Sequence, residues 1–325
     1  HTMKSIAVIG AGLAGSIAAL SLQKSAKVTV FEKSGRAGGR MSTRRVETYK
    51  FNHGAQFFTA RNPQFKDFLE PYIEQGIVAQ WNPQITTLDP LDKPFKRIWY
   101  EPHYVGMPGM SALASSLAED LNVHYHCEIA SLESIGKTWQ LRDAQHNDCG
   151  EFDWVISAVP SAQALNILGS KIQQHAKIAD VVFSPCFSLM LGLKNKPALG
   201  FDAAVVKNSP ISWLAQTHAD QEKNYGLVIH SDNAWAKTHI DDEKKLLQEQ
   251  LFTSAQELLS NSLQDVQYAA LHRWLYAKVE TSAQEDYLID SENRLAVCGE
   301  WCRGNRVEDA FLSGLKLAEF LKTQL

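Results

Sequence analysis

A glycine-rich turn between an apolar strand and a helix constrains this chain more than any other feature. Residues 6–9 are apolar and run directly into the pattern Gly10-x-Gly12-x-x-Gly15. A helix rich in Ala and Leu follows, and then a second strand at 28–31 that ends at Glu32. Strand, glycine turn, helix, strand and acid in this order are typical of a dinucleotide-binding βαβ unit.

The three glycines have separate roles in such a unit. Gly10 permits the tight turn, Gly12 lets a pyrophosphate approach the backbone, and Gly15 lets the helix pack close to the strand. The free N–H groups at the start of the helix face the phosphates. Glu32 follows Gly12 by about 20 residues, where an acid accepts hydrogen bonds from an adenosine ribose. The sequence therefore predicts an ADP-containing dinucleotide. The expected contacts are Gly10, Gly12, Leu13, Ala14, Gly15 and Glu32.

A second phosphate-binding pattern follows at once. Gly38 and Gly39 are adjacent and are flanked by Arg36 and Arg40, whose planar guanidinium groups suit phosphate oxygens. An NAD-binding dehydrogenase seldom needs a second cradle, because its nucleotide crosses a single turn, whereas an extended FAD does need one. The pattern therefore indicates FAD. The further contacts expected from this segment are Lys33, Arg36, Gly38, Gly39, Arg40 and Met41.

Residues 32–42 (EKSGRAGGRMS) resemble the second dinucleotide signature of the FAD-dependent amine oxidase and phytoene desaturase superfamily. This resemblance implies that the strand at 294–297 ends in a Gly-acid pair that meets the ribityl or phosphate region of FAD. It also implies that the last helix, which runs through Leu321, aims its positive N-terminal end at the flavin. Glu300 replaces the usual Asp, and Asp309 stands where relatives often carry Gly. The contacts that the resemblance implies are Gly299, Glu300, Val307, Glu308 and Ala310.

Further segments resemble the bacterial renalase-like oxidoreductases. Residues 51–61 (FNHGAQFFTAR) match a renalase-type pattern in which Gly-Ala-Gln-aromatic passes beneath the flavin, and 104–111, 271–277 and 299–302 match other segments. The resemblance extends over nearly the whole chain, although Asn52 stands where Asp is common. It adds Gly54, Ala55 and Gln56 to the expected FAD contacts, and the superfamily pattern adds the backbone at Ile129 beside the adenine.

The renalase resemblance implies an oxidase of mis-reduced dihydronicotinamides. Such an enzyme returns the 2- and 6-dihydro isomers of NAD(P)H to NAD(P)+, and its reduced flavin passes electrons to dioxygen to give hydrogen peroxide. The protein then needs to stack a flat ring over the flavin. No catalytic side chain is expected, so substitution of His53, His230 or His272 is expected to change the rate modestly. The expected substrate contacts are Phe57, Phe58, Thr59, Arg61, Trp99, Tyr104, Cys186, Trp274 and Trp301.

Two other functions stay open. An amine oxidase or desaturase-like enzyme would share the FAD signatures, but the chain shows neither the typical lysine near the flavin nor a cysteine motif for covalent attachment. Its 325 residues are also few for the larger substrate domains of those enzymes. A non-catalytic FAD-bound redox sensor is the second alternative. The FAD itself is expected to be bound without a covalent link.

The predicted fold is α/β, with a discontinuous Rossmann-type FAD-binding domain and a second domain built on an antiparallel sheet. The first domain is expected to comprise 3–60, 105–165 and 285–325, and the substrate domain 61–104 and 166–284. Thr238-x-x-Asp241 is a possible capping box. Helices are expected at 63–75, 111–121, 161–168 and 241–260, and strands at 123–127, 154–158, 188–193, 203–206, 211–216, 225–230 and 267–274.

Composition excludes several classes of protein. A net charge of −4 argues against a nucleic-acid binder. No apolar run approaches the about 18 residues that span a bilayer, and no signal peptide precedes the first strand. His1 and Thr2, ahead of Met3, resemble the remnant of an affinity tag. We expect a cytoplasmic monomer whose partners are the dihydronicotinamide nucleotide and dioxygen, without nucleic acid or membrane.

The five cysteines show no CxxC spacing, and their odd number leaves at least one free. This usage fits a reducing compartment and predicts neither a disulfide framework nor a metal site. Cys298 and Cys302 are expected to be small buried apolar residues near the cofactor.

Overall fold

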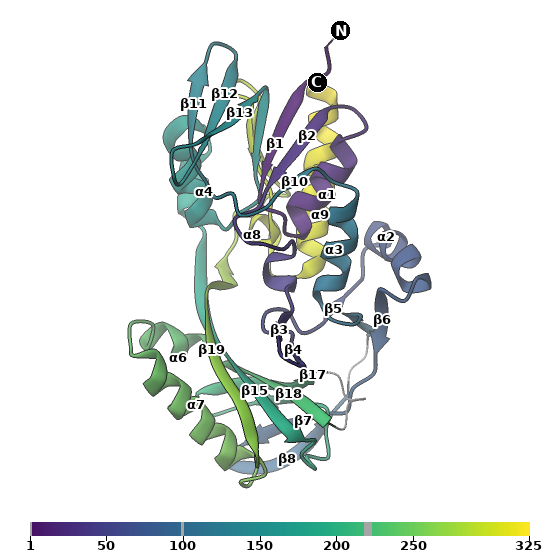
Figure 1. Cartoon of the computed structure of the whole chain (residues 1–325), viewed down its shortest axis with the longest axis vertical. Coiled ribbons are helices and arrows are strands. Elements are labelled where there is room, and N and C mark those ends of the chain that lie inside the picture. The colour runs from purple at the N-terminus through teal and green to yellow at the C-terminus, as the bar shows by residue number, and fades with distance from the viewer. Residues whose placement is uncertain (1, 99–100, 218–222) are drawn as a thin grey trace.

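The computed structural model describes residues 2–98, 101–217 and 223–325. Figure 1 shows two bodies, one above the other, and both chain termini lie at the upper end. The chain passes between the bodies several times, most visibly along the long strands β15 (Val182–Asn195) and β19 (Val266–Thr281). Each body is built on its own sheet.

The upper body contains a six-stranded sheet in the order β10-β2-β1-β14-β21-β20. Every neighbouring pair is parallel except β20 with β21. The chain order reverses at β1, and ligands of such sheets bind beside the carboxyl end of the strand at that point. The strands are β1 (Ser5–Ile9), β2 (Lys27–Phe31), β10 (Val123–His124), β14 (Trp154–Ser157), β20 (Leu288–Asp290) and β21 (Leu295–Val297).

Both faces of this sheet are covered. Helices α1 (Leu13–Leu22), α3 (Ser111–Glu119) and α9 (Val307–Leu321) form one layer (Figure 1). On the other face lie α4, α5, the short helix α8 and an antiparallel three-stranded sheet. Their bounds are α4 (Ser161–Leu168), α5 (His175–Ala179), α8 (Glu300–Arg303), β11 (Ile129–Ile135), β12 (Thr138–Asp143) and β13 (Asp148–Phe152).

The last helix packs directly on the first. A Cβ atom at Gly314 of α9 would lie 2.3 Å from the carbonyl oxygen of Ala14 in α1. A Cβ atom at Gly15 would lie 2.1 Å from the carbonyl oxygen of Gly10. Both positions therefore require glycine, and the two ends of the chain meet backbone to backbone beside the glycine turn.

The lower body contains a seven-stranded sheet in the order β19-β15-β18-β17-β16-β7-β8. Its neighbouring strands are antiparallel except β16 with β7. Alternate residues of β15, such as Leu189 and Leu191, are buried beneath α6 (Asn233–Thr238) and α7 (Lys244–Leu258). The other strands are β7 (Ile85–Asp89), β8 (Asp92–Arg97), β16 (Ala203–Val206), β17 (Ile211–Thr217) and β18 (Lys223–Ser231).

Small elements fill the space between the two bodies. The hairpin of β3 (Arg44–Val46) and β4 (Tyr49–Phe51) packs on the sheet face opposite α7, where Phe51 is buried against Met190 and Val228. A three-stranded sheet is formed by β5 (Phe58–Thr59), β9 (His103–Gly106) and β6 (Val78–Trp81). Helix α2 (Pro63–Glu74) packs its Phe65 ring against Phe311 of α9, with ring centroids 4.9 Å apart.

The predicted fold class is confirmed: a Rossmann-type parallel sheet stands above a largely antiparallel one. The helices expected at 63–75, 111–121 and 161–168 are present as α2, α3 and α4. The five strands predicted in the lower sheet are present: β16 has the expected bounds, and β15 and β19 extend to 14 and 16 residues. Strands β6, β7, β8, β11, β12 and β13 were not predicted. The assignment of residue ranges to two domains stays a prediction.

Two local predictions were wrong. The strand expected at 123–127 ends at His124, because His126 adopts a left-handed φ of 53° and turns the chain. The Thr238 hydroxyl does not cap α7. It donates to the Ala234 carbonyl oxygen within α6 at 3.1 Å, and α7 begins only at Lys244.

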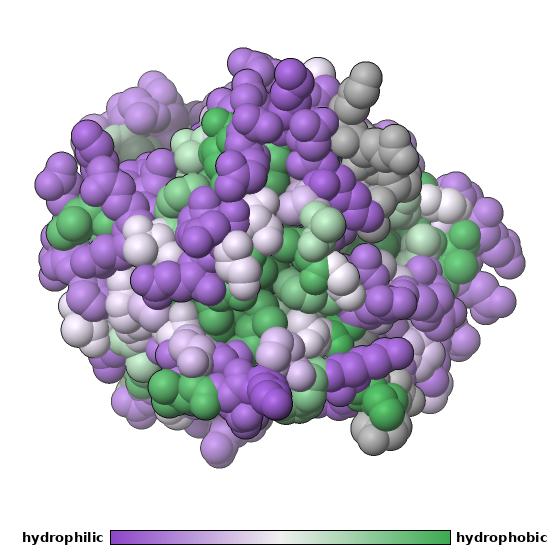
Figure 2. Space-filling view, turned by 90° about the horizontal axis from the view of Figure 1, so that it is seen from below, coloured by the Kyte–Doolittle hydropathy of each residue, from purple (hydrophilic) through white to green (hydrophobic). Residues whose placement is uncertain are grey.

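Polar groups limit the exposed apolar surface of the lower body. Seen from below, hydrophobic residues are visible near the middle of this face and hydrophilic residues surround them (Figure 2). Leu91 and Ile98, beside edge strand β8, are 80% and 69% exposed. The strand itself carries lysines and a proline, which oppose pairing with another sheet edge. Among the described residues, no helix combines the length and apolar character needed to cross a bilayer.

Candidate flavin and substrate site

The two glycine loops face each other at the carboxyl end of β1. The N–H of Gly38 donates to the carbonyl oxygen of Ala11 at 3.0 Å, and a Cβ atom at Gly39 would lie 3.7 Å from Cα of Gly12. A Cβ atom at Gly12 would meet nothing within 4 Å, so this backbone borders open space. Gly10 has a left-handed φ of 106°, which makes the turn. Backbone N–H groups beside open space at a helix N-terminus suit a phosphate.

Glu32 is held beside the glycine turn. Its Oε1 accepts the N–H of Ala11 at 3.1 Å, and its Oε2 accepts the N–H and the hydroxyl of Ser34 at 2.8 Å each. These bonds fix the carboxylate at the end of β2, and its ribose contact stays a prediction. Of its predicted neighbours, Lys33 and Arg36 are exposed, whereas the Met41 side chain is buried in the core with α1 and α3.

Arg40 connects the second glycine loop to three other parts of the molecule. Its guanidinium group forms an ion pair with Glu300 and donates to the carbonyl oxygens of Tyr276 at 2.9 Å and Ala277 at 3.3 Å, both on β19. Its own carbonyl oxygen accepts the N–H of Ala55 at 2.7 Å. The predicted cofactor residues Arg40, Ala55 and Glu300 therefore lie together. A Cβ atom at Gly54 would lie 2.1 Å from the Arg40 carbonyl oxygen, so only glycine fits there.

The C-terminal residues hold the entry to α9. The N–H of Gly299 donates to the hydroxyl of Ser313 at 3.0 Å. Asp309 accepts the N–H of Arg306 at 3.1 Å, which caps the helix and explains an acid at this position. Ala310 is buried and Val307 is half-buried beside it.

Glu308 accepts backbone hydrogen bonds, and its expected contact with FAD stays a prediction. Its Oε1 accepts the N–H groups of Arg61 at 2.7 Å and Asn62 at 2.6 Å, and the side chain is buried. Its observed partners are thus the backbone that precedes α2, because two adjacent N–H groups point at the start of α9.

Asn52 keeps the turn before Gly54 in place. Its Oδ1 accepts the Thr43 hydroxyl at 2.9 Å and the N–H of Met110 at 3.0 Å. An amide oxygen fills this acceptor role as a carboxylate would, so Asn at this position preserves the turn. The Gln56 amide donates to the Asn52 carbonyl oxygen.

A row of side chains crosses the lower sheet on the face opposite α7. Trp213, His230, Ser188 and His272 lie directly opposite one another on β17, β18, β15 and β19. Cβ atoms that pair in this way share one face of a sheet. The same face packs against β4, which leads into the predicted flavin-contacting segment. This row, which we call the ring row, therefore faces the cofactor loops.

His53 ties that segment to the ring row. Its carbonyl oxygen accepts hydrogen bonds from Nε2 of His230 and Nε1 of Trp274, each at 3.0 Å. Its imidazole lies 4.9 Å from the ring of His272 and 5.0 Å from that of Trp274, centroid to centroid. The segment Gly54–Gln56 therefore begins at a cluster of rings.

The imidazoles of this cluster are held neutral. Burial, with the nearby His272 and Arg44, lowers the pKa of His53 to about 3. Burial also lowers the pKa of His230 and of His272. A neutral imidazole carries no net charge at pH 7, so these rings add no charge to the face, and the exposed Arg44 guanidinium is the charge that acts on both His53 and His272.

A second ring cluster lies at the other end of the segment. Phe57 contacts Trp81, Trp213 and His103, with centroid distances of 5.7, 5.6 and 5.1 Å. Phe57 is one of the substrate contacts expected from the sequence, and the other three rings are not. Trp213 could have been found from the sequence. It lies in one predicted strand and His230 in the next, and the two residues are opposite each other when these strands pair. Offset and edge-on rings at these distances form a surface on which a flat ring can stack.

Two predicted substrate contacts, Phe58 and Trp301, are wrong, and those of Arg61 and Trp99 stay predictions. Phe58 is 3% exposed within the upper core, and Trp301 is 1% exposed with its Nε1 donating to the Val159 carbonyl oxygen at 3.0 Å. Neither can touch a substrate, because core packing covers both rings. Arg61 pairs with Glu101 at the surface. Trp99 lies outside the described residues.

The remaining predicted contacts keep some access. Trp274 is half-buried in the ring cluster described above, and Thr59 and Tyr104 are also half-buried. Cys186 is buried opposite Trp274, and burial raises the pKa of its thiol to about 11. Cys298 and Cys302 are fully buried, as expected of small apolar residues.

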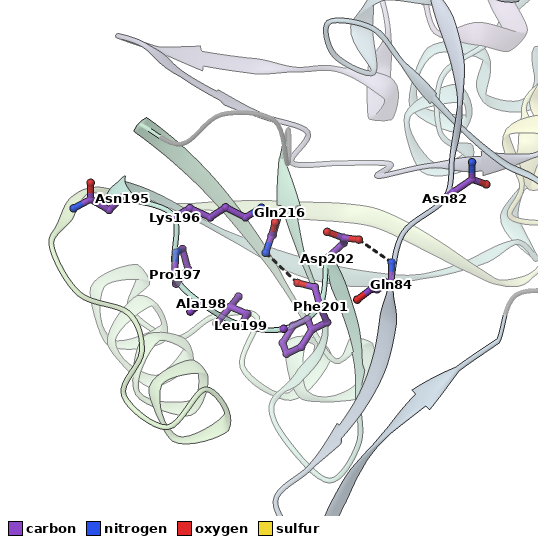
Figure 3. Close-up of a pocket in the computed structure, with 11 residues that line it drawn as sticks. Asn82, Gln84, Asn195, Lys196, Pro197, Ala198, Leu199, Phe201, Asp202 and Gln216 are labelled. Atoms are coloured by element: carbon purple, nitrogen blue, oxygen red, sulfur yellow. Dashed lines mark hydrogen bonds between the residues drawn. The ribbon is translucent and has the colours of Figure 1, made fainter.

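A separate hollow of about 740 Å³ lies at the outer end of the lower sheet. The loop 195–202 lines it together with Asn82, Gln84 and Gln216 (Figure 3). The N–H of Gln84 donates to Asp202 at 2.7 Å, and the Gln216 amide donates to the Phe201 carbonyl oxygen at 3.0 Å. None of the predicted cofactor or substrate residues lines this hollow.

These residues fit FAD. The facing loops at Gly12 and Gly39 leave open backbone for a pyrophosphate, and Glu32 stands at the ribose side of the turn. Arg40 and Glu300 lie together between the second loop and the C-terminal helix, which is the side expected for the flavin end. The Gly54–Gln56 segment then lies between the loops and the ring row.

Comparison with known proteins supports this interpretation. A model of the NAD(P)-binding Rossmann-like domain matches residues 8–72, and a model of the flavin containing amine oxidoreductase family matches residues 99–320. Renalase of Mus musculus is 21% identical over 312 residues, which cover 87% of each protein.

Solved structures share the fold at low sequence identity. A candidate protoporphyrinogen oxidase from Exiguobacterium sp. 255-15 has a TM-score of 0.80 at 11% identity, with all of both chains covered. A variant of putrescine oxidase has a TM-score of 0.76 at 11% identity over 99% of both chains. An oxidoreductase from Methanosarcina mazei has a TM-score of 0.74 at 14% identity, covering 97% of this chain and 100% of that one.

The amine oxidoreductase match spans well over half of the chain and includes the C-terminal segment that meets the glycine loops. The predictions of an FAD cofactor and of an oxidoreductase are confirmed. The chain belongs to the flavin containing amine oxidoreductase family and is an FAD-dependent oxidoreductase similar to renalase.

Proposed function

We propose that this enzyme is an oxidase of mis-reduced dihydronicotinamides, and that it returns the 2- and 6-dihydro isomers of NAD(P)H to NAD(P)+. Bound FAD supplies the hydride acceptor and, through reoxidation by dioxygen, gives hydrogen peroxide. The similarity to renalase over most of the chain supports this proposal. The observation that carries it is the uncharged set of rings opposite the cofactor loops.

The rings suit a flat, uncharged donor. Phe57 and Trp213 offer aromatic faces, and His230 and His272 are neutral imidazoles on the same side of the sheet. These groups hold a dihydropyridine ring by stacking, and a neutral imidazole can accept or donate a hydrogen bond to its carboxamide. Orientation is then the main contribution of the protein, since loss of hydride from such a ring restores aromaticity.

No proton needs to move in the hydride-transfer step, and the later reduction of dioxygen to hydrogen peroxide takes up one proton from solvent. The low pKa of His53 keeps its imidazole neutral at neutral pH, so it is not a general acid there. Its carbonyl oxygen instead holds His230 and Trp274 in position. His53 is therefore a positioning residue, and the buried rings around it exclude water from the reacting face.

An amine oxidase or a desaturase-like enzyme is the competing function. The ring row contains no carboxylate. A protonated amine that left water to bind there would therefore find no opposite charge in that row to offset its lost hydration. This favours the neutral dihydronicotinamide over a protonated amine. A redox sensor without turnover differs from both, because it would release no peroxide steadily.

Anaerobic titration of the flavin absorbance tests the proposed substrate. The 2- and 6-dihydro isomers of NADH and NADPH are expected to bleach the bound flavin rapidly, because their rings can stack between the two ring clusters. Ordinary amines and diamines are expected to leave it oxidised. In air, the isomers are expected to give one hydrogen peroxide for each NAD(P)+.

Rapid bleaching by amines, with none by the isomers, would reject the proposal in favour of an amine oxidase. Bleaching by the isomers without continued peroxide release in air would favour the sensor. The 4-dihydro forms, ordinary NADH and NADPH, serve as the matched control for isomer selectivity.

Trp213→Ala tests the ring surface. Loss of one stacking partner is expected to raise the isomer concentration for half-maximal flavin reduction about three- to tenfold, with the FAD content unchanged. Trp213→Phe keeps a ring and is expected to retain most of the affinity. Trp235→Phe is the control, because Trp235 packs against Phe187 and His239 on the α6 side. Equal affinity of Trp213→Ala and the wild type would place the substrate elsewhere.

His53→Gln tests the neutral histidine through stability. The unfolded chain binds a proton at His53 below pH 6.5, whereas the folded chain binds it only near pH 3, so acid favours unfolding. As the pH falls below 6.5, His53 therefore lowers the free energy of unfolding by up to about 1.4 kcal/mol for each pH unit. His53→Gln is expected to reduce this slope between pH 6 and 4, measured by urea unfolding, roughly as one proton predicts.

The rate of flavin reduction in His53→Gln is expected to fall by less than about tenfold. This loss is smaller than the rate loss expected when a general base is removed. His175→Gln, at an exposed histidine, is the control for the pH slope. A rate loss of a thousandfold or more in a folded His53→Gln enzyme would show that His53 moves a proton.

A further inference from the structure

Three metal-binding side chains meet at one end of the β11-β12-β13 sheet. Cys127 lies just before β11, Asp143 ends β12, and Cys149 is the second residue of β13. One ligand atom from each lies within 4.8 Å of the other two, and all three residues are half-buried. They fall within 23 consecutive residues, and their sheet is separate from the sheet that carries the ring row.

The distance between the two sulfur atoms favours a shared cation. The Sγ atoms of Cys127 and Cys149 are 3.7 Å apart. Two thiolates at about 2.3 Å from a tetrahedral Zn²⁺ are about 3.8 Å from each other. A disulfide would bring them to about 2.0 Å, which is much shorter than the observed distance.

Asp143 is already oriented toward the sulfur atoms. Its Oδ1 accepts the N–H groups of Gln145 at 2.9 Å and Asn147 at 2.8 Å, and its Oδ2 accepts the Asn147 amide at 3.1 Å. These bonds leave free lone pairs on the carboxylate, and metal-bound carboxylates are commonly held by such outer hydrogen bonds. Among the described residues, no ion pair includes Asp143.

We propose that Cys127, Asp143 and Cys149 form a binding site for a soft to borderline divalent cation, best fitted by Zn²⁺. Two thiolates and a carboxylate supply three of the four tetrahedral ligands, and water supplies the fourth because the site is partly exposed. Zinc replaces the thiol protons, so its binding releases protons to solvent.

The position of the site suggests what the cation stabilises. The N–H of Cys127 donates to the carbonyl oxygen of Glu32 at 3.0 Å, and β11 begins two residues later at Ile129. A cation there joins the β12–β13 turn to the segment beside the predicted ribose and adenine contacts. The site therefore reinforces the adenosine side of the cofactor domain, whatever substrate the enzyme oxidises.

Zinc stoichiometry of the FAD-bound enzyme tests the site. Reduced enzyme is incubated with ZnCl₂, passed over a desalting column, and analysed for metal by mass spectrometry. Wild type is expected to keep one Zn²⁺ per chain. Cys149→Ser is expected to keep none, and Asp143→Asn is expected to bind zinc at least about tenfold more weakly. Cd²⁺ is expected to add ultraviolet thiolate-to-metal absorption only where both cysteines are present.

Asp148→Asn is the matched control, because this neighbouring carboxylate accepts the Gly150 N–H and is not one of the three ligands. Flavin absorbance confirms that each variant is folded. The proposal would be overturned if the wild type kept no zinc. It would also be overturned if Cys149→Ser and Asp143→Asn kept as much zinc as the wild type. Three free thiols instead of five in the denatured, unreduced protein would overturn it too, since Cys127 and Cys149 would then form a disulfide.

Discussion

Close backbone contact between the first and last helices is the constraint on which the site depends. Gly314 in α9 and Ala14 in α1 approach so closely that no Cβ atom fits between them, and Gly15 likewise lets α1 lie on the glycine turn. This contact brings residues 299–310 to the loops at Gly12 and Gly39. The cofactor site is therefore assembled from both ends of the chain, and neither end contains it alone. A single extended dinucleotide accounts for both glycine loops and for the helix N-terminus beside them.

Arg40 connects the cofactor loops to the lower body. Its guanidinium group bonds the carbonyl oxygens of Tyr276 and Ala277 on β19, and the ring row lies on the same strand and its neighbours. The placement of the substrate wall relative to the cofactor loops thus rests on these charge-assisted hydrogen bonds together with the apolar packing of Phe51 against Met190 and Val228. The wall offers rings and neutral imidazoles, because burial lowers the pKa of His53, His230 and His272. Such a surface orients a flat donor and leaves the redox chemistry to the cofactor.

The sequence predicted the parts of the site that depend on local backbone geometry. The glycine turn, the Gly38-Gly39 loop and the final helix follow from short-range patterns, and the structure brings them together. The sequence did not reveal that Trp81 and His103 contact Phe57, or that Trp213 pairs with His230. These contacts depend on strand register and on crossings between distant segments. Phe58 and Trp301 were misjudged for the same reason, since aromatic residues of the core and of a substrate wall look alike in sequence. Cys127 and Cys149 escaped notice because 22 positions separate them along the chain.

FAD titration of the Gly12→Ala apoprotein tests the central claim most directly. A Cβ atom at Gly12 would touch no protein atom within 4 Å, and its φ of −71° is open to alanine, so the fold should tolerate the change. The same Cβ atom would occupy the space assigned to the pyrophosphate. Fluorescence quenching should show one FAD per wild-type chain and at least about tenfold weaker binding to the variant, with the free energy of unfolding of the apoprotein changed by no more than about 0.5 kcal/mol. Equal FAD affinity of the two proteins, or a wild-type apoprotein that takes up no FAD, would contradict the account.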